Sequence, residues 1–210
     1  KIRLENGFVN LALIDPDTKN DSKLISIINT INKSNFDGIL VGGSKINDNL
    51  FNKRIKTIKE KSTLPLILFP GSSSQVSKDI DSMLYLNLIS GRNPKYLIEE
   101  QVDASFLINN FKIQPIPTAY ILLNGGTKTS VEIVSKTKPL NMNDFDNILK
   151  HTLAGKYLGN KIIYFDCGSG AKNKISISLL KYIKEKIDIP IMVGGGIKNN
   201  DDILELIKAG

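Results

Sequence analysis

Short apolar runs recur along the whole chain, and hardly any of them alternates with polar residues. They are Val9–Ile14, Gly38–Val41, Leu64–Phe69, Met83–Leu88, Ile116–Leu123, Lys161–Phe165 and Ile189–Val193. Unbroken apolar runs of this length are typical of strands that are buried on both faces, as in a parallel sheet. The pattern therefore predicts a parallel sheet built from these segments.

Stretches with a helical period separate several of these runs. They are Ser22–Ser34, Asp144–Leu158 and Ile175–Ile187. Strands that alternate with helices indicate crossover connections, and repetition over the whole chain predicts an α/β fold, a (β/α)8 TIM-like barrel. We expect one barrel domain over residues 1–210, truncated at its C-terminus so that the eighth βα unit is not in the sequence. An open doubly wound sheet is the alternative.

One connection is too short for a regular unit. Between Pro70 and the strand at Met83 lies only "PGSSSQVSKDID", about the minimum length for a crossover that contains a helix. We therefore expect a modified barrel whose third helix is missing or reduced to a loop.

Composition limits the class of protein. The chain has 210 residues, one cysteine and a net charge of +7. A single cysteine forms no internal disulfide, and no apolar run reaches the length of a membrane span, so we expect a cytoplasmic protein. The lysines are scattered along helical stretches, which favours solvated helix faces over a nucleic-acid site and leaves anionic substrates or a membrane surface as weaker possibilities.

Polar residues and glycines follow the predicted strands where a barrel carries its chemistry. Strand one ends in "LIDPD", strand two in "VGGS", strand six in "YFDCGSG" and strand seven in "VGGGIKN". Strand six thus delivers a carboxylate, Asp166, followed by glycines that let backbone N–H groups approach an anion closely. Two such glycine turns on neighbouring late strands predict a phosphate site, although either turn alone has a purely steric explanation. Neither turn has the full dinucleotide fingerprint or the P-loop order.

The remaining candidates for catalytic and metal-binding side chains are narrowed by elimination. His151, the only histidine, lies in a predicted helix and is expected to be structural or exposed; Cys167 is expected to be a small buried filler. Without histidine or cysteine clusters, a metal should be hard and oxygen-bound, which favours Mg²⁺. Asp15 is the leading ligand, with helix capping as its alternative, and Ser44 either completes the metal site or caps the next helix.

Seven segments in this order resemble the geranylgeranylglyceryl phosphate synthase family, including its heptaprenylglyceryl phosphate synthase relatives. They are "LIDPD", "VGGS", "LFPGS", "YLNLISGRNP", "GGTKTSVE", "YFDCGSGA" and "MVGGGIKN". The resemblance implies a Mg²⁺-dependent prenyltransferase that joins the C3 hydroxyl of sn-glycerol 1-phosphate to a long prenyl diphosphate, with geranylgeranyl as the expected chain. The product is an ether phospholipid precursor, and diphosphate leaves. The family also has a modified barrel without helix three.

The resemblance assigns roles to residues. Asp15 and Ser44 would hold Mg²⁺ with the diphosphate, and Asp166 would be the general base, assisted by Tyr164. Glycerol phosphate would bind at Tyr164, Phe165, Asp166, Cys167, Gly168, Ser169, Gly170, Gly194, Gly195 and Gly196. We expect the prenyl tail to lie in an apolar groove near Tyr96 and Leu97. Ordinary helix packing would explain large side chains at these positions equally well.

The sequence departs from the family at one key position. The family pattern is "YLEAGSG", so the shorter Asp166 stands where glutamate is usual, and Cys167 stands in place of alanine. A carboxylate displaced by roughly 1 Å can lose about 10²-fold in rate. Two alternatives therefore stay open: a sugar-phosphate isomerase or lyase barrel, and a phosphoglycerol-binding barrel without catalysis. A homo-oligomer and a transient membrane-surface contact are further expectations.

Overall fold

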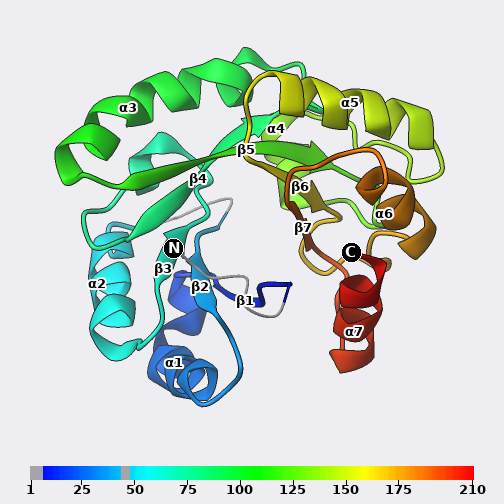
Figure 1. Ribbon diagram of the computed structural model, residues 1–210. Helices are drawn as coiled ribbons and strands as arrows, with labels where there is room; N and C mark the ends of the chain where they lie inside the picture. Colours follow the sequence, from blue (N-terminus) through cyan, green and yellow to red (C-terminus); the bar gives the residue numbers. More distant parts are fainter. Residues whose placement is uncertain (1–6, 44–47) are drawn as a thin grey trace. The chain divides into compact units, whose positions relative to one another are not determined.

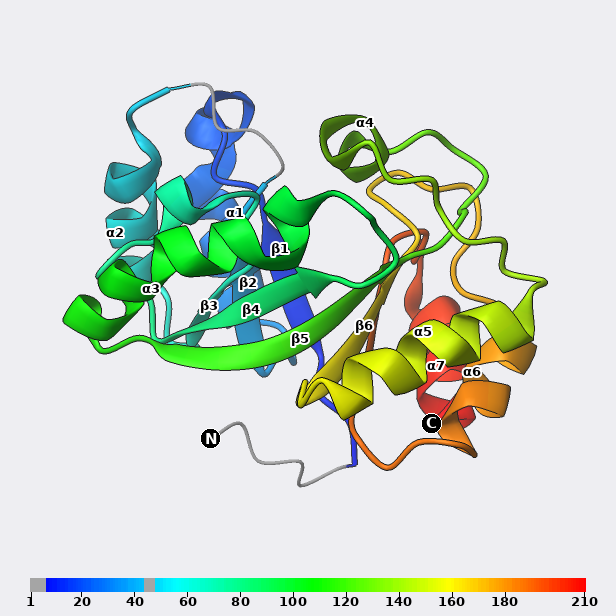
Figure 2. The same cartoon turned by 90° about the horizontal axis from the view of Figure 1, so that it is seen from above.

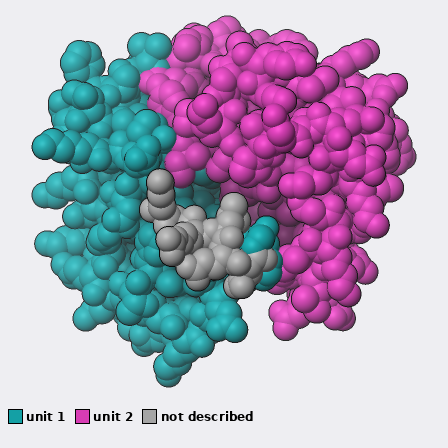
Figure 3. Space-filling model, viewed as in Figure 1, with its two compact units in different colours: residues 1–84, 102–115 teal, residues 85–101, 116–210 magenta. Residues whose placement is uncertain are grey.

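The structure is a computed structural model that describes residues 7–43 and 48–210. It divides into two compact units (Figure 3). The first comprises residues 1–84 and 102–115, and the second comprises residues 85–101 and 116–210. Each unit is built from parallel strands and the helices that pack on them.

The first unit begins with three parallel strands. These are β1 (Leu11–Ile14), β2 (Gly38–Val41) and β3 (Leu66–Leu68), and they pair in chain order, with Ile39 opposite both Ala12 and Leu66. Every residue of β2 is buried. The strand β4 (Ser82–Leu88) pairs with β3 at its start.

Two helices of the first unit lie side by side (Figures 1 and 2). They are α1 (Leu24–Asn32), which follows the 3₁₀ helix η1 (Thr18–Lys23), and α2 (Phe51–Lys61). Each buries one apolar stripe at helical spacing: Leu24, Ile28 and Ile31 in α1, and Phe51, Ile55 and Ile58 in α2. Lysines occupy much of the remaining surface of α2, as the sequence predicts.

The short third connection contains no α-helix. Between β3 and β4 the chain forms only η2, a 3₁₀ helix over Ser73–Gln75. The prediction of a reduced third helix is therefore confirmed.

The second unit contains the strands that carry the glycine turns. Here β5 (Gln114–Leu122), β6 (Ile162–Asp166) and β7 (Ile191–Gly194) pair in parallel, with Phe165 opposite both Ile121 and Val193. The helices α5 (Phe145–Tyr157), α6 (Ile177–Lys184) and α7 (Asn200–Ala209) lie together beside β6 (Figure 2). A short helix that the periodicity did not indicate, α4 (Ser130–Ser135), precedes α5.

The segment between β4 and β5 is helical throughout most of its length. It consists of a π-helical turn, η3 (Lys95–Glu99), that continues into α3 (Glu100–Phe111). Within the described residues, no helix of the chain is both long and apolar enough to cross a membrane.

The strand order decides between the two predicted topologies. The sheet runs β1-β2-β3-β4-β5-β6-β7, so each strand neighbours the one before it in the chain. A doubly wound sheet reverses its strand order at a switch point, and this sheet never does. The α/β fold is thus of the modified (β/α)8 type, and the single domain over residues 1–210 stays a prediction.

Candidate active site

The carboxylate of Asp166 ends strand β6 and is the best-defined polar group of the second unit. It is only 6% exposed. Its Oδ1 accepts a hydrogen bond from the backbone N–H of Gly168 over 2.7 Å, and its Oδ2 accepts one from the Tyr120 hydroxyl over 2.5 Å. Burial raises the pKa of Asp166, and these two hydrogen bonds oppose that rise. The result is a carboxylate held in one place with a basicity greater than usual.

Two tyrosines stand beside this carboxylate. Tyr120 on β5 is directly opposite Tyr164 on β6, and their rings stack with centroids 5.2 Å apart. Burial raises the pKa of both phenols well above the ordinary value, so they remain neutral hydrogen-bond donors. Tyr120 was missed in the sequence because no motif contains it. Its alignment with Tyr164 in the neighbouring strand is the signal that was available.

The two predicted glycine turns meet. A methyl group on Gly195 would lie 2.5 Å from the backbone nitrogen of Gly168, so only glycine lets the turns after β6 and β7 approach this closely. Gly168 and Gly195 also have φ values of 91° and 79°, which favour glycine. Gly194 packs against the Tyr164 hydroxyl, where a methyl group would come within 2.4 Å. Ser169 and Gly170 are exposed at the tip of the first turn.

The segment "GGTKTS" forms the third wall of the same loop cluster. A methyl group on Gly168 would lie 2.0 Å from Cγ2 of Thr129, and one on Gly125 would lie 2.5 Å from the carbonyl oxygen of Cys167. Thr129 is buried, and its hydroxyl caps α4 by accepting from the Glu132 N–H over 3.1 Å. Thr129 and Gly125 therefore fix the position of the glycine turn, a role that the sequence motif did not indicate.

Helix N-termini contribute less to this site than the sequence suggests. The side chain of Ser176 caps α6, and that of Asn199 caps α7. The first turn of α7 also carries Asp201 and Asp202, which already complement the helix dipole. An anion at this site would therefore depend on the backbone of the glycine turns rather than on a helix end.

Two predicted substrate residues point elsewhere. Phe165 and Cys167 are fully buried in the apolar cluster that α5 and α6 form with β5 and β6. Burial raises the pKa of the Cys167 thiol to about 12, so it is a filler and not a nucleophile. Only the backbone of these two residues is available to a ligand on the face that carries Tyr164 and Asp166.

In the first unit, Asp15 follows β1 and presents one free oxygen. Its Oδ2 pairs with Lys19 Nζ over 2.6 Å, while its Oδ1 is buried without a hydrogen-bond partner among the described residues. A methyl group on Gly43 would lie 2.6 Å from that Oδ1, so the glycine leaves room beside it. The capping role predicted for this motif belongs to Asp17, which accepts from the Lys19 N–H.

An unpaired carboxylate oxygen suits a hard cation. Mg²⁺ commonly takes one or two carboxylates and completes its coordination with substrate phosphates and water. The described residues contain no cluster of three or more histidine, cysteine or acidic side chains, so Asp15 would be a lone anchor of this kind. Ser44, the second predicted ligand, lies outside the described residues.

A buried arginine holds the loop that follows Asp15. Arg54 on α2 donates to both oxygens of Asp21, to both oxygens of Asp48 and to the Pro16 carbonyl. Asp48 also accepts from the Thr18 hydroxyl over 2.6 Å. This network ties the segment after β1 to the segment before α2. Nothing in the sequence marks this network, because Arg54 stands among lysines of the same charge.

The remaining candidates have definite neighbours. Tyr96, half-buried in η3, donates from its hydroxyl to the Val134 carbonyl over 3.4 Å, and the Leu97 carbonyl accepts from Asn87. His151 lies in α5, as predicted, and its ring contacts Arg92. Neither Tyr96 nor Leu97 lines the pocket formed by residues 90–92, residues 136–141, Asn147 and His151, and their place beside a prenyl chain stays a prediction.

The family model described as the PcrB family matches residues 2–210 of the chain. Among curated relatives, the geranylgeranylglyceryl phosphate synthase of Flavobacterium johnsoniae is 42% identical over 207 residues, which is 98% of this chain and 85% of the relative. The enzyme of that name from Thermoplasma volcanium is 34% identical over 99% of this chain and 82% of its own length.

Solved structures agree with the fold. The Thermoplasma volcanium protein superposes with a TM-score of 0.89, covering 96% of this chain and 81% of the other. The synthase of Thermoplasma acidophilum, solved in complex with the substrate sn-glycerol-1-phosphate, is 32% identical with a TM-score of 0.91 and covers 98% and 83% of the two chains. A structure described as an aldolase, QR15, is 12% identical with a TM-score of 0.59, a likeness that shows the fold alone.

Proposed function

The chain belongs to the PcrB family, and we propose that it is a geranylgeranylglyceryl phosphate synthase. It joins the C3 hydroxyl of sn-glycerol 1-phosphate to C1 of a long prenyl diphosphate, which yields an ether phospholipid precursor and diphosphate. Curated relatives carry this name over nearly the full length of the chain. A similar solved structure is described as a complex with sn-glycerol-1-phosphate.

The observation that carries the assignment is the pairing of Asp166 with the glycine turns. The buried carboxylate of Asp166 lies two positions before Gly168, whose backbone packs directly on that of Gly195. Backbone N–H groups in such turns bind phosphate oxygens, and the carboxylate beside them can accept the proton of a glycerol hydroxyl. These are the two things that the acceptor substrate requires.

The chemistry needs little more from the chain than position and a base. An allylic diphosphate ionises readily, so the incoming hydroxyl must be held close and lose its proton as the C–O bond forms. Asp166 accepts that proton, and Tyr120 and Gly168 keep its two oxygens oriented. The side chain, one carbon shorter than the glutamate usual in the family, is thus held in one orientation by two hydrogen bonds.

Mg²⁺ would be held at Asp15, together with the donor's diphosphate. When bound, it supplies Lewis-acid stabilisation of the leaving group's charge. Support comes from the buried Oδ1 of Asp15, which has no hydrogen-bond partner among the described residues, and from the space that Gly43 leaves beside it. Ser44 is the second proposed ligand.

The prenyl chain requires an apolar surface. Tyr96 and Leu97 are the proposed groove residues. We expect geranylgeranyl diphosphate as the donor because the similar relatives are named for it.

Two alternatives remain to be compared with this function. A sugar-phosphate isomerase or lyase would share the anion site, but membership of the PcrB family argues against it. A barrel that binds glycerol phosphate without catalysis differs from the proposed enzyme only in turnover.

We also propose self-association and a cytoplasmic location. On α3, the apolar side chains of Val102 and Phe106 are 61% and 79% exposed, which favours a contact between copies of the chain or a transient contact with a membrane surface. Analytical ultracentrifugation of the wild type beside Phe106→Ser tests the first possibility.

The function is tested by incubating the chain with radiolabelled sn-glycerol 1-phosphate and prenyl diphosphates of increasing length, with Mg²⁺ or with EDTA. The proposal predicts a lipid-extractable ether product with geranylgeranyl diphosphate that requires the metal. The proposal would be overturned if product formed without a prenyl donor, or if no product formed with any of the donors.

A further inference from the structure

The second unit contains a cavity that shares no lining residue with the candidate active site. Its volume is about 480 Å³. The walls come from the loop after β4 (residues 90–92), from the segment between α4 and α5 (residues 136–141), and from Asn147 and His151 of α5. A volume of this size falls in the range of small-molecule sites, roughly 300–1,000 Å³.

The charge of this cavity is of one sign. Arg92, Lys136 and Lys138 line it, and no aspartate or glutamate does. None of these three side chains forms an ion pair with a carboxylate of the described residues. All three side chains are exposed, so solvent screens them in part, but their shared sign still favours an anion in the cavity.

Arg92 is held in place by neutral groups. Its Nη1 donates to the carbonyls of Ile89, over 3.3 Å, and Gly91, over 2.6 Å. Its Nη2 lies 3.3 Å from Nε2 of His151, while Nδ1 of the same ring lies 2.8 Å from the Asn147 carbonyl. Since a guanidinium only donates, Nε2 accepts and Nδ1 carries the proton. The arginine is therefore oriented without being neutralised.

The choice of arginine here is informative. The chain has 28 lysines and arginines, of which only Arg3, Arg54 and Arg92 are arginines. Arg54 uses its planar fork to bind two carboxylates within the fold. Arg92 has the same fork, and its contacts are with two carbonyls and a histidine ring rather than with a carboxylate of the described residues. The "GRNP" segment has no other role in the proposed reaction.

A buried hydroxyl adds a second, independent indication of a ligand. Thr137 lines the cavity and is only 4% exposed, and its Oγ1 has no hydrogen-bond partner among the described residues. Buried polar groups are nearly always paired, so the orphan hydroxyl of a residue that lines the cavity is a candidate partner for a ligand. Gly91 makes room for it, because a methyl group there would lie 2.8 Å from this oxygen.

We propose that this cavity is a second anion site, which binds a small molecule through a phosphate or diphosphate group held by Arg92, Lys138 and the hydroxyl of Thr137. Arg92 supplies the directed N–H groups, and Lys136 and Lys138 supply charge at the entrance. The site is independent of the proposed transferase reaction, since none of its residues belongs to the catalytic or glycerol phosphate positions.

The single histidine makes the test direct. Because His151 is the only histidine of the chain and lines the cavity, its ring signals in a ¹H–¹³C NMR spectrum report on this site alone. Inorganic pyrophosphate is titrated into the wild-type chain in the presence of EDTA, and inorganic phosphate is titrated separately. We expect saturable shifts of the His151 signals, with tighter binding of pyrophosphate.

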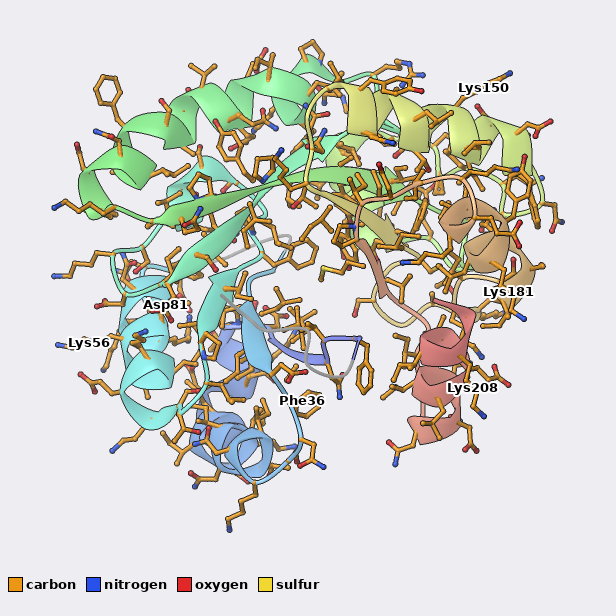
Figure 4. The ribbon with its side chains drawn as sticks, viewed as in Figure 1. Phe36, Lys56, Asp81, Lys150, Lys181 and Lys208 are labelled. Atoms are coloured by element: carbon orange, nitrogen blue, oxygen red, sulfur yellow. The ribbon has the colours of Figure 1, made fainter. Side chains whose placement is uncertain are left out.

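Variants decide whether the binding is specific. Arg92→Gln with Lys138→Gln should weaken pyrophosphate binding by about tenfold or more, and Lys138→Gln alone, at an exposed position, should weaken it less. The matched control is Lys150→Gln. Lys150 is an exposed lysine of α5, the helix that carries His151, and it does not line the cavity (Figure 4). This substitution should leave the affinity for pyrophosphate unchanged. Shifts that never saturate, or an equal loss in the control, would overturn the proposal.

Discussion

The hydroxyl of Tyr120 lies 2.5 Å from Oδ2 of Asp166, so the proposed base is bound by a side chain from the neighbouring strand. Both residues are buried, and the second oxygen of Asp166 is bound by the Gly168 N–H. The neighbouring strands β5 and β6 place these groups by their register, which aligns Tyr120 with Tyr164. The basicity of Asp166 therefore depends on a residue outside its own motif.

Replacing Tyr120 by phenylalanine should shift the pH dependence of the reaction. The tyrosine hydrogen bond lowers the pKa of Asp166, against the larger effect of burial that raises it. Without that bond the pKa rises further, so the acid limb of kcat/KM should move to higher pH, and kcat should fall because the carboxylate is less well oriented. The measurement is a pH–rate profile of both proteins.

Tyr182→Phe is the matched control for this experiment. It removes a tyrosine hydroxyl that donates to Asp146 at an exposed position. Its acid limb should coincide with that of the wild type. An unchanged limb in Tyr120→Phe would show that Asp166 is not the group that titrates.

Gly168→Ala should weaken both the fold and the binding of glycerol phosphate. The backbone at Gly168 has a φ of 91°, which costs a residue with a Cβ about 1 kcal/mol, and the added methyl would also clash with Thr129. We expect a lower Tm and a higher KM for sn-glycerol 1-phosphate, with KM for the prenyl donor little changed.

Gly159→Ala separates strain from position. Gly159 has a similar φ of 88°, but a methyl group there meets no atom within 4 Å. It should lower Tm by less than Gly168→Ala and leave both KM values unchanged. Equal effects of the two substitutions on KM would contradict a role of the Gly168 turn in binding glycerol phosphate.

Arg54→Met should lower the Tm at neutral pH and reduce the loss of stability in acid. Arg54 holds the pKa values of Asp21 and Asp48 below the ordinary value of 3.8 through hydrogen bonds. The folded chain thus binds fewer protons at these groups than the unfolded chain. The resulting stabilisation is complete above their unfolded pKa and is lost as the pH falls through the lower folded values.

The variant lacks that acid-sensitive contribution, so its Tm should vary less between neutral and acidic pH. Thermal unfolding followed by circular dichroism measures this. Lys56→Met is the control because Lys56 is an exposed cation of the same helix whose nearest carboxylate, on Glu60, is 3.9 Å away (Figure 4). A control that matched Arg54→Met would contradict a specific role for the arginine.

Much of the fold could be predicted because burial leaves a direct mark on the sequence. The seven apolar runs coincide with β1 to β7, and the twelve-residue connection that begins at Pro70 forms only η2. The adjacency of the glycine turns also followed from topology, since parallel strands present their carboxyl ends at one edge. Local pattern and chain order were sufficient for these features.

Side-chain partners across strands could not be read in the same way. Tyr120 reaches Asp166 from β5, and Thr129 reaches Gly168 from the start of α4. Nothing in the local sequence of either residue separates it from ordinary core residues. Arg54 looks like one more surface cation until the fold brings Asp21 and Asp48 to it. Such contacts depend on register and loop path, which apolar periodicity does not specify.

The most direct test of the proposed function is the turnover of Asp166→Asn with sn-glycerol 1-phosphate and geranylgeranyl diphosphate, measured beside its affinity for glycerol phosphate by calorimetry. Asparagine preserves the size of the side chain and removes the base. We expect kcat to fall by roughly 10²–10⁴-fold while glycerol phosphate still binds. A variant with wild-type turnover would contradict the role of Asp166 as the general base of a prenyl transfer.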